Sequence, residues 1–294
     1  MDRLRRILAS FGKAEFLFVW YGLTMALLLA LHGGEVPGRT WWILFHLAFV
    51  PIARFLSRFP ITWWHILILL AWVVTCFSTL GIFLKDLVPE PMQFEVLALN
   101  EALGGMQVQA GLSHPPAWLA EVCVLCYSSF YFLPLILMLA LARERKSAAI
   151  HHLLILVGGG FLLSYIGYAC WPTLPPYRFL VFDEALHGGP LFPFFHRWLY
   201  EGEPLRQDCM PSGHTMMTLL TMYAAWIYSR RQLLWLLPVG SFLILGTIVL
   251  RYHWFADLLA AIPFFLLAIY LFRDEDPQPV EEPALNPGGS GSGS

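Results

Sequence analysis

Charged residues are scarce in this sequence, since only 13% of the 294 residues are Asp, Glu, Lys or Arg. A soluble domain typically carries about 25% charged residues, so the soluble globular class is excluded. Lysine and arginine are not in excess either, because the formal net charge is −2, and nothing electrostatic favours nucleic acid as a partner. Five cysteines do not form a disulfide framework. The sequence also lacks internal repeats and glycine-rich nucleotide-binding loops.

Long apolar runs fill most of the chain, and 58% of the residues are hydrophobic. Backbone polar groups must be satisfied internally in lipid, and a run of apolar residues does this as a helix. The sequence therefore predicts an all-α integral membrane protein with about eight transmembrane helices. They lie at 16–31, 41–53, 61–84, 118–142, 148–170, 215–228, 233–250 and 254–272.

Basic residues orient these spans. With a cytoplasmic N-terminus, 12 of the 18 lysines and arginines fall in the inside segments, and every short inside turn is basic. The positive-inside rule then predicts a multi-pass protein with both termini cytoplasmic. The polar motifs described below fall on the extracytoplasmic side, which is periplasmic or lumenal.

Three parts of the chain are predicted. Residues 1–60 form an N-terminal two-helix addition, residues 61–272 a six-helix catalytic membrane domain, and residues 273–294 a disordered tail that ends in an artificial-looking glycine-serine linker. Two long outside loops are expected at 85–117 and 171–210, the first with an interfacial helix near 92–103. A disulfide between Cys170 and Cys209 is left open; it would close the second loop.

The first polar motif is PSGH at residues 211–214, directly before an apolar run. Ser212 has the side chain of a helix N-cap. The start of a helix offers free N–H groups and the positive end of the helix dipole, which suit an anion such as phosphate. We therefore expect Ser212 and Gly213 to contribute to a phosphate site, with His214 beside them.

The second polar motif is RYHWFAD at residues 251–257. His253 and Asp257 are spaced i, i+4, so on a helix they would share one face, and the carboxylate would fix the imidazole tautomer. Arg251 supplies a permanent cation with forked donors. The two apolar runs between the motifs, joined by a short basic turn at 229–231, predict a helical hairpin that brings both motifs to one membrane level. Ionisable groups within spans are costly and usually functional.

Together with the segment YACWPTLPPYR at 168–178, these motifs resemble the type 2 phosphatidic acid phosphatase superfamily. Within it, the chain is most similar to the branch of inositol phosphorylceramide synthases and sphingomyelin synthases. The resemblance covers about residues 118–272. It implies a phosphate-binding role for Arg178, which the nearby prolines would direct toward the hairpin. Arg206 and Asp208 are weaker candidates.

The resulting hypothesis is a two-step phosphoryl transfer without metal or cofactor. His253, oriented by Asp257, attacks phosphorus and forms a phosphohistidine, and His214 protonates the leaving oxygen. Arg178, Arg251 and the N–H groups near Ser212 and Gly213 stabilise the phosphoryl oxygens. The acidic residues near the site are too few and too scattered for a two-metal cluster.

Two departures from the common phosphatase pattern leave the substrate class open. Trp171 stands where that pattern has a lysine, and Thr247 stands where it has an arginine. The first candidate function is a lipid phosphatase whose partners are a phosphorylated lipid and the membrane. The second is a phosphotransferase that passes a phospho-head group to a lipid hydroxyl. A proton-coupled transporter with a His–Asp relay is the third.

Overall fold

The computed structural model describes residues 13–56, 58, 63–88, 92–202 and 207–273. The predicted tail and its linker lie outside these residues, except for Arg273. The candidate residue Arg206 also lies outside them. The described residues are helical, and their only extended pairing is an isolated bridge between Thr173 and Asp208. This bears out the all-α prediction.

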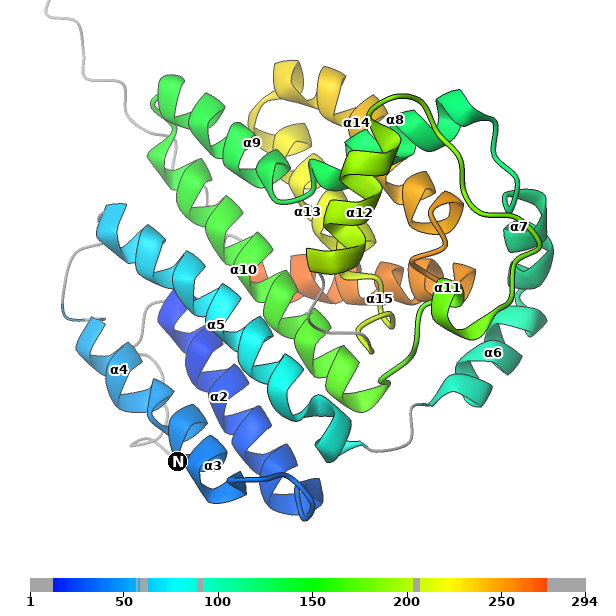
Figure 1. The fold of residues 1–294 in the computed structure, drawn as a ribbon. Coiled ribbons are helices and arrows are strands. Elements are labelled where there is room, and N and C mark those ends of the chain that lie inside the picture. Colours follow the sequence, from blue (N-terminus) through cyan, green and yellow to red (C-terminus); the bar gives the residue numbers. More distant parts are fainter. Residues whose placement is uncertain (1–12, 57, 59–62, 89–91, 203–206, 274–294) are drawn as a thin grey trace, which may run out of the picture.

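The helices follow one another along the whole chain (Figure 1). Their bounds are α2 Lys13–His32, α3 Arg39–Leu47, α4 Phe49–Leu56, α5 Trp63–Leu87, α6 Gln93–Ala102, α7 Gly105–Gly111, α8 Ala117–Ser128, α9 Phe132–Arg143, α10 Ser147–Cys170, α11 Pro176–Phe179, α12 Phe192–Gly202, α13 Gly213–Tyr228, α14 Arg230–Val249 and α15 Phe255–Phe272.

Helix α10 is the centre of the packing. It contacts α2 and α5 on one side and α9, α13 and α15 on the other, as the ribbon shows (Figure 1). Small residues allow the close approaches: a Cβ at Gly160 would collide with Met217 and Leu220 of α13, and a Cβ at Gly167 would collide with Pro211. The PSGH segment can therefore lie directly against α10.

Three helices among the described residues are long and apolar enough to cross a membrane, namely α10, α14 and α15. A fourth span is present if α8 and α9, which meet at an angle of 59°, count as one. The run at 41–53 forms two short helices, α3 and α4. The eight predicted spans are thus not confirmed as a set, and the additional ones stay predictions.

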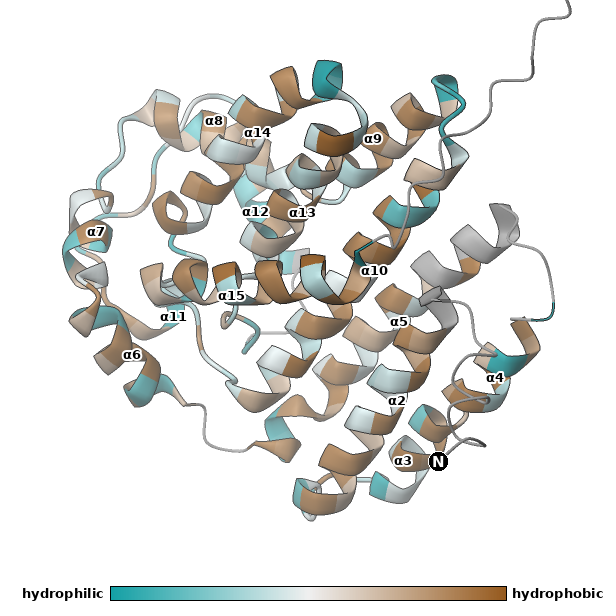
Figure 2. Ribbon diagram, turned by 180° about the vertical axis from the view of Figure 1, so that it is seen from behind, coloured by the Kyte–Doolittle hydropathy of each residue, from teal (hydrophilic) through white to brown (hydrophobic). Residues whose placement is uncertain are grey.

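Many large apolar side chains face outward, and Leu234, for example, is 76% exposed. In Figure 2 the hydrophobic colour dominates α9, α10 and α15, and hydrophilic colour gathers at turns and along α6 and α7. Such extensive exposed apolar surface is unusual in a soluble monomer. It matches an integral membrane protein, whose outer surface contacts lipid.

The apolar run predicted as a span at 118–142 forms two helices, α8 and α9, with a break between Ser128 and Phe132. Pro134 lacks an N–H group, so the carbonyl of Phe130 loses its helical partner, and the proline ring would clash with that carbonyl. At the start of the break, Ser129 Oγ donates to the carbonyl of Cys126 at 2.6 Å. The break places Phe130 beside His214, at 4.3 Å between ring centroids.

The ends of the long loop at 171–210 meet without a disulfide. Cys170 and Cys209 are both free thiols, the first exposed and the second buried. The backbone N–H of Thr173 donates to the carbonyl of Gln207 at 3.1 Å, next to the bridge with Asp208. These contacts hold together the two ends of the loop. A disulfide between Cys170 and Cys209 would have joined the same two ends.

Candidate active site

The predicted hairpin is present, since α13 and α14 pack against each other with only Ser229 between them. It brings the two motif histidines together. His253 Nε2 lies 3.4 Å from His214 Nδ1, and the two rings meet edge to face. His253 is buried and His214 is partly exposed. Residues 39 positions apart in sequence therefore form one polar pair inside an apolar bundle.

The other nitrogen of His253 is held by two acceptors. Its Nδ1 lies 3.1 Å from the carbonyl oxygen of Cys209 and 3.4 Å from Asp257 Oδ2. A carbonyl oxygen can only accept, so Nδ1 carries the proton in this arrangement. The lone pair of the neutral ring is then on Nε2, which faces His214. This is the tautomer that a nucleophilic imidazole needs.

Asp257 reaches His253 by a different route from the one that the sequence predicts. His253 precedes α15, whose N-cap is Trp254, so the pair does not share a helix face. Asp257, in the first turn, reaches back so that Oδ2 accepts the N–H of Trp254 at 2.8 Å and also approaches His253. The side chain that caps the helix thus also positions the histidine. Its second oxygen, Oδ1, is buried without a hydrogen-bond partner among the described residues.

Ser212 is the N-cap of α13, as predicted, because its Oγ accepts the N–H of Thr215 at 3.2 Å. Its own N–H is unavailable to a phosphate, since it donates to the carbonyl of Asp257 at 3.0 Å. Gly213 and His214 open the helix, and no preceding turn accepts from their N–H groups. A Cβ at Gly213 would collide with the hydroxyl of Tyr168, so glycine lets the start of α13 approach α10.

Two aromatic residues of the broken span enclose His214, and sequence analysis missed both. The ring of Tyr127 stacks on His214 at 4.3 Å, and its hydroxyl lies 3.2 Å from His214 Nδ1. Phe130 covers another part of the imidazole. No sequence signal pointed to them, because a Tyr and a Phe within an apolar run are typical of ordinary packing. Tyr127 lies in α8, and Phe130 lies in the break before α9.

The structure does not bring Arg251 into hydrogen-bond contact with either histidine. Its backbone is left-handed, with φ +65°, and its guanidinium donates to the carbonyls of Ser113 at 2.6 Å and Glu184 at 3.0 Å. It also lies 3.9 Å above the ring of Phe182. These contacts join the loop at 85–117 to the loop at 171–210. Burial lowers the pKa of Arg251.

Arg178 lies in α11 and is partly exposed, with Nε donating to the hydroxyl of Tyr177 at 3.1 Å. The N–H of Tyr177 donates to the carbonyl of Arg251 at 3.1 Å, and its ring packs edge-on against Tyr252. The segment that carries Arg178 is therefore attached to the second motif, as the prolines predict. No described contact links the Arg178 side chain to the histidines, so its phosphate role stays a prediction.

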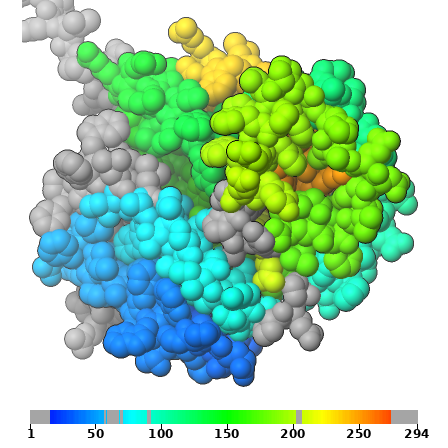
Figure 3. All heavy atoms as spheres, viewed as in Figure 1, coloured from blue at the N-terminus to red at the C-terminus, as the bar shows by residue number. Residues whose placement is uncertain are grey.

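His196 of α12 also lies close to the second motif, stacked between Phe192 and Tyr252 at 4.9 and 6.2 Å. Burial lowers the pKa of its imidazole, and the charge of Arg251 lowers it further. Figure 3 shows α12 and its neighbouring loop in lime green on the surface of the molecule, with the orange of the α15 region visible behind them. Helix α12 therefore covers the site on the side where Arg251 lies.

Cys209, His253 and Asp257 each offer a donor atom, and these atoms lie within 4.8 Å of one another. Such a set has the chemistry of a metal site. Two of the donors are already engaged with each other or with the backbone, as described above, and Cys209 Sγ donates to the carbonyl of Tyr252 at 3.6 Å. A metal ion here would have to displace the proton on His253 Nδ1, so the donor arrangement fits an oriented imidazole better.

Asn100 of α6, in the segment 85–117, supports the start of α15. Its Oδ1 accepts the N–H of Ala256 at 3.1 Å, and its Nδ2 donates to Gln109 Oε1 at 2.9 Å. The side chain is fully buried. This contact satisfies one of the N–H groups that a helix start leaves without a partner.

Replacing Asn100 with leucine should lower the stability of the protein by about 1–3 kcal/mol, because it leaves two buried polar groups without partners. The measurement is the thermal unfolding midpoint in detergent. Glu101→Gln, an exposed change on the same helix, is the control and should leave the midpoint unchanged. An equal midpoint for both variants would show that Asn100 does not support α15.

The fold and the site together define a helical membrane protein with two adjacent histidines, of which the buried His253 is oriented by a carboxylate. A family model described as the PAP2 superfamily matches residues 95–271. The chain belongs to this superfamily, and its membership fits a phosphatase or phosphotransferase. Searches of curated proteins and of solved structures gave no match.

Proposed function

We propose that the chain is a membrane-embedded lipid phosphatase or phosphotransferase that works through a phosphohistidine at the extracytoplasmic face. The observation that carries this is the His253–His214 pair, in which Nδ1 of one ring is fixed and its Nε2 faces the other ring at 3.4 Å. Family membership supports phosphoryl chemistry. The positive-inside distribution supports the side of the membrane.

In the first step, His253 Nε2 attacks phosphorus while the bond from phosphorus to the ester oxygen breaks. His214, as an imidazolium, gives its proton to that oxygen, so the alcohol leaves neutral. Asp257 is the positioning residue: it holds the Nδ1 proton and stabilises the positive charge that the ring gains. The N–H groups of Gly213 and His214 face the phosphoryl oxygens, and Arg178 supplies a positive charge from the loop.

In the second step, an oxygen nucleophile attacks the phosphohistidine, the P–N bond breaks, and neutral His214 takes the nucleophile's proton. Water as nucleophile gives a phosphatase, and a lipid alcohol gives a phosphotransferase. One observation favours the transferase. Thr247, at a position that carries arginine in the common phosphatase pattern, is buried, and its carbonyl accepts the N–H groups of Tyr252 and His253 at 3.0 and 2.9 Å. Thr247 thus holds the backbone of His253 in place and, unlike an arginine, adds no positive charge to the phosphate site.

The deciding experiment uses purified protein and ³²P-labelled phospholipid, with and without a lipid alcohol as acceptor. Release of free phosphate in both reactions identifies a phosphatase, and label that moves to the acceptor identifies a transferase. A protein that binds or moves the lipid without cleaving any phosphate ester would be a transporter or binding protein, and the proposal would be wrong.

Activity should persist in EDTA and fall in vanadate. The scheme stabilises phosphoryl charge with backbone N–H groups and cations, and vanadate adopts the geometry of five-coordinate phosphorus. Initial rates after chelation and gel filtration, with and without added divalent ions, provide the measurement. Loss of activity that zinc or magnesium restores would assign Cys209, His253 and Asp257 to a metal and overturn the scheme.

A further inference from the structure

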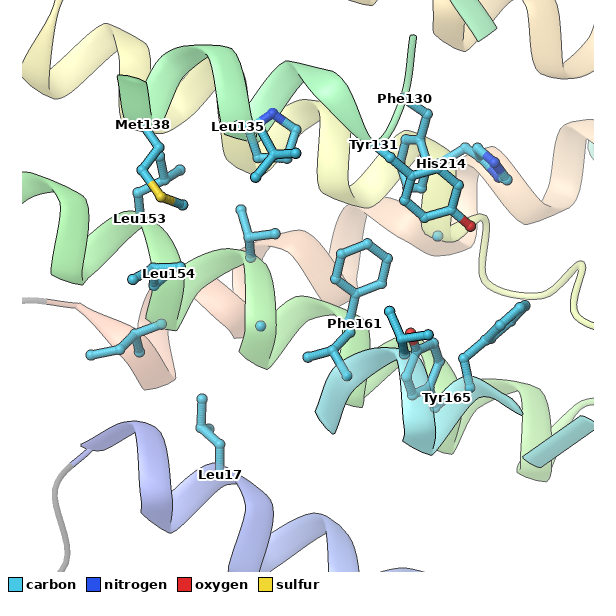
Figure 4. Close-up of a pocket in the computed structure, with 18 of the residues that line it drawn as sticks. Leu17, Phe130, Tyr131, Leu135, Met138, Leu153, Leu154, Phe161, Tyr165 and His214 are labelled. Atoms are coloured by element: carbon cyan, nitrogen blue, oxygen red, sulfur yellow. The ribbon is translucent and has the colours of Figure 1, made fainter. Parts of the chain in front are cut away.

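A cleft of about 400 Å³ runs from the histidine site along α10. Its size falls in the range of small-molecule sites. Side chains from α2, α5, α9, α10 and α13 line it. Figure 4 shows His214 and Tyr131 near one end of the cleft and Leu17, Leu153 and Leu154 near the other.

The polarity of this cleft changes along its length. The polar lining residues Asp208 and His214 lie at one end, with Tyr168, whose hydroxyl faces Gly213. The opposite end is lined by apolar side chains, including Leu17, Phe18 and Met138. A ligand that matches this lining has a polar head at His214 and a hydrocarbon tail away from it.

The length of the cleft follows from the stripe that α10 contributes. Leu154, Gly158, Phe161, Tyr165 and Tyr168 all line it and repeat at helical spacing on one face. From the first to the last, α10 rises by about 21 Å at 1.5 Å per residue. One leaflet of a bilayer is about 15 Å of hydrocarbon, half of the roughly 30 Å core. The cleft is therefore long enough for a chain that enters from one leaflet.

One wall of the cleft comes from outside the family domain. Leu17 and Phe18 belong to α2, and Val73, Val74 and Phe77 belong to α5, whereas the family match begins at residue 95. Both helices pack on α10. Phe18 of α2 stacks on Trp72 of α5 at 4.1 Å, which fixes these two helices to each other beside the cleft.

We propose that α2 and α5 form the outer wall of a site for the hydrocarbon chain of the lipid whose phosphate reacts at His214, and that its apolar end sets the chain length accepted. The proposal rests on the proposed function and adds the substrate determinant. Continuity with the histidine site and the polarity of the two ends identify the occupant as a lipid chain. Residues outside the family match thereby select among substrates.

Gly158 provides a direct test because it lies about one helical turn from Leu154, at the apolar end of the stripe, and no neighbouring heavy atom lies within 4 Å of where its Cβ would stand. Gly158→Phe should place a ring across the cleft without moving the backbone. The ratio of kcat/KM for long-chain to short-chain phospholipid should fall by about 10-fold or more, the scale of pocket discrimination by chain size. Hydrolysis of p-nitrophenyl phosphate, which has no chain, should keep its wild-type rate.

Leu139→Phe is the matched control. Leu139 lies on α9 next to the lining residue Met138, but it is 57% exposed and does not line the cleft. It should leave the ratio unchanged. A second blocking variant, Val74→Phe on α5, should shift the ratio in the same direction as Gly158→Phe, so the test does not depend on one substitution. A wild-type ratio in both blocking variants, or an equal fall in the ratio of the control, would overturn the proposal.

Photolabelling supplies a readout that is independent of turnover. A phosphonate lipid with a diazirine at the chain terminus should label α2, α5 or the apolar end of the cleft in the wild-type protein, and Gly158→Phe should abolish this labelling. Labelling confined to other surfaces would overturn the chain site. The two proposals fail differently: wild-type protein that cleaves no phosphate ester contradicts the proposed function, whereas cleavage without chain-length dependence contradicts only the cleft.

Discussion

Replacing His253 with alanine should reduce turnover of phospholipid by about 10⁴-fold or more, the scale found when other enzymes lose a covalent nucleophile. The variant has no nitrogen where Nε2 faces His214, so the first step has no acceptor for the phosphoryl group. The measurement is a rapid quench of ³²P-lipid with wild-type and variant protein. Acid-labile, alkali-stable label should appear on the wild-type chain and be absent from His253→Ala.

His152→Ala is a suitable control because His152 is also a buried histidine with two partners, the hydroxyl of Tyr228 at 2.5 Å and the carbonyl of Phe272 at 2.9 Å. It joins α10 to the ends of α13 and α15, far along the chain from the motifs. Its loss should lower thermal stability and leave the phosphoenzyme in place. Wild-type turnover by His253→Ala would remove His253 as the nucleophile.

The parts of the site that local sequence determines were predicted correctly. Ser212 caps α13, the hairpin closes, and His214 and His253 meet, because helix starts, apolar runs and a short basic turn each leave a direct signature. The helix expected near 92–103 is α6, which is shorter by one residue at each end. These features depend on residues close in sequence, so one sequence suffices to find them.

The parts that depend on long-range packing were not predicted. The guanidinium of Arg251 is held by carbonyls 67 and 138 residues away, and the sequence does not predict these partners. Tyr127 of α8 reaches His214 from 87 residues away. The i, i+4 spacing identified the His253–Asp257 pair, but the two residues do not share a helix face as the sequence predicts. His253 lies just before the N-cap and Asp257 lies in the first turn of α15, and this arrangement has the same spacing.

The wall formed by α2 and α5 shows the same limit at the level of domains. The sequence predicts the first two spans as an addition to the catalytic core, whereas the structure places Leu17 of the first span on the cleft that leads to His214. Periodicity identifies a helix as apolar but does not say which neighbour it packs against. Assigning a substrate role to these helices therefore required the packing against α10.

Replacing His214 with alanine should separate acid catalysis from nucleophilic attack. With a phospholipid, whose leaving alcohol needs a proton, the rate should fall by about 10²–10⁴-fold, the usual contribution of a general acid. With p-nitrophenyl phosphate, whose leaving group departs as a stable anion, phosphorylation of His253 should persist and label should accumulate. The measurement compares the two substrates in one quench experiment.

Tyr127→Phe is the comparison variant for His214, because it keeps the stacked ring and removes only the hydroxyl that lies 3.2 Å from Nδ1. It should leave the phosphoenzyme intact and retain most of the rate, since the imidazole keeps its place beside His253. Equal losses on both substrates in His214→Ala would mean that His214 only positions its partner. A selective loss on the lipid assigns the proton to His214, and the 3.4 Å contact between the rings then brings acid and nucleophile to the same ester bond.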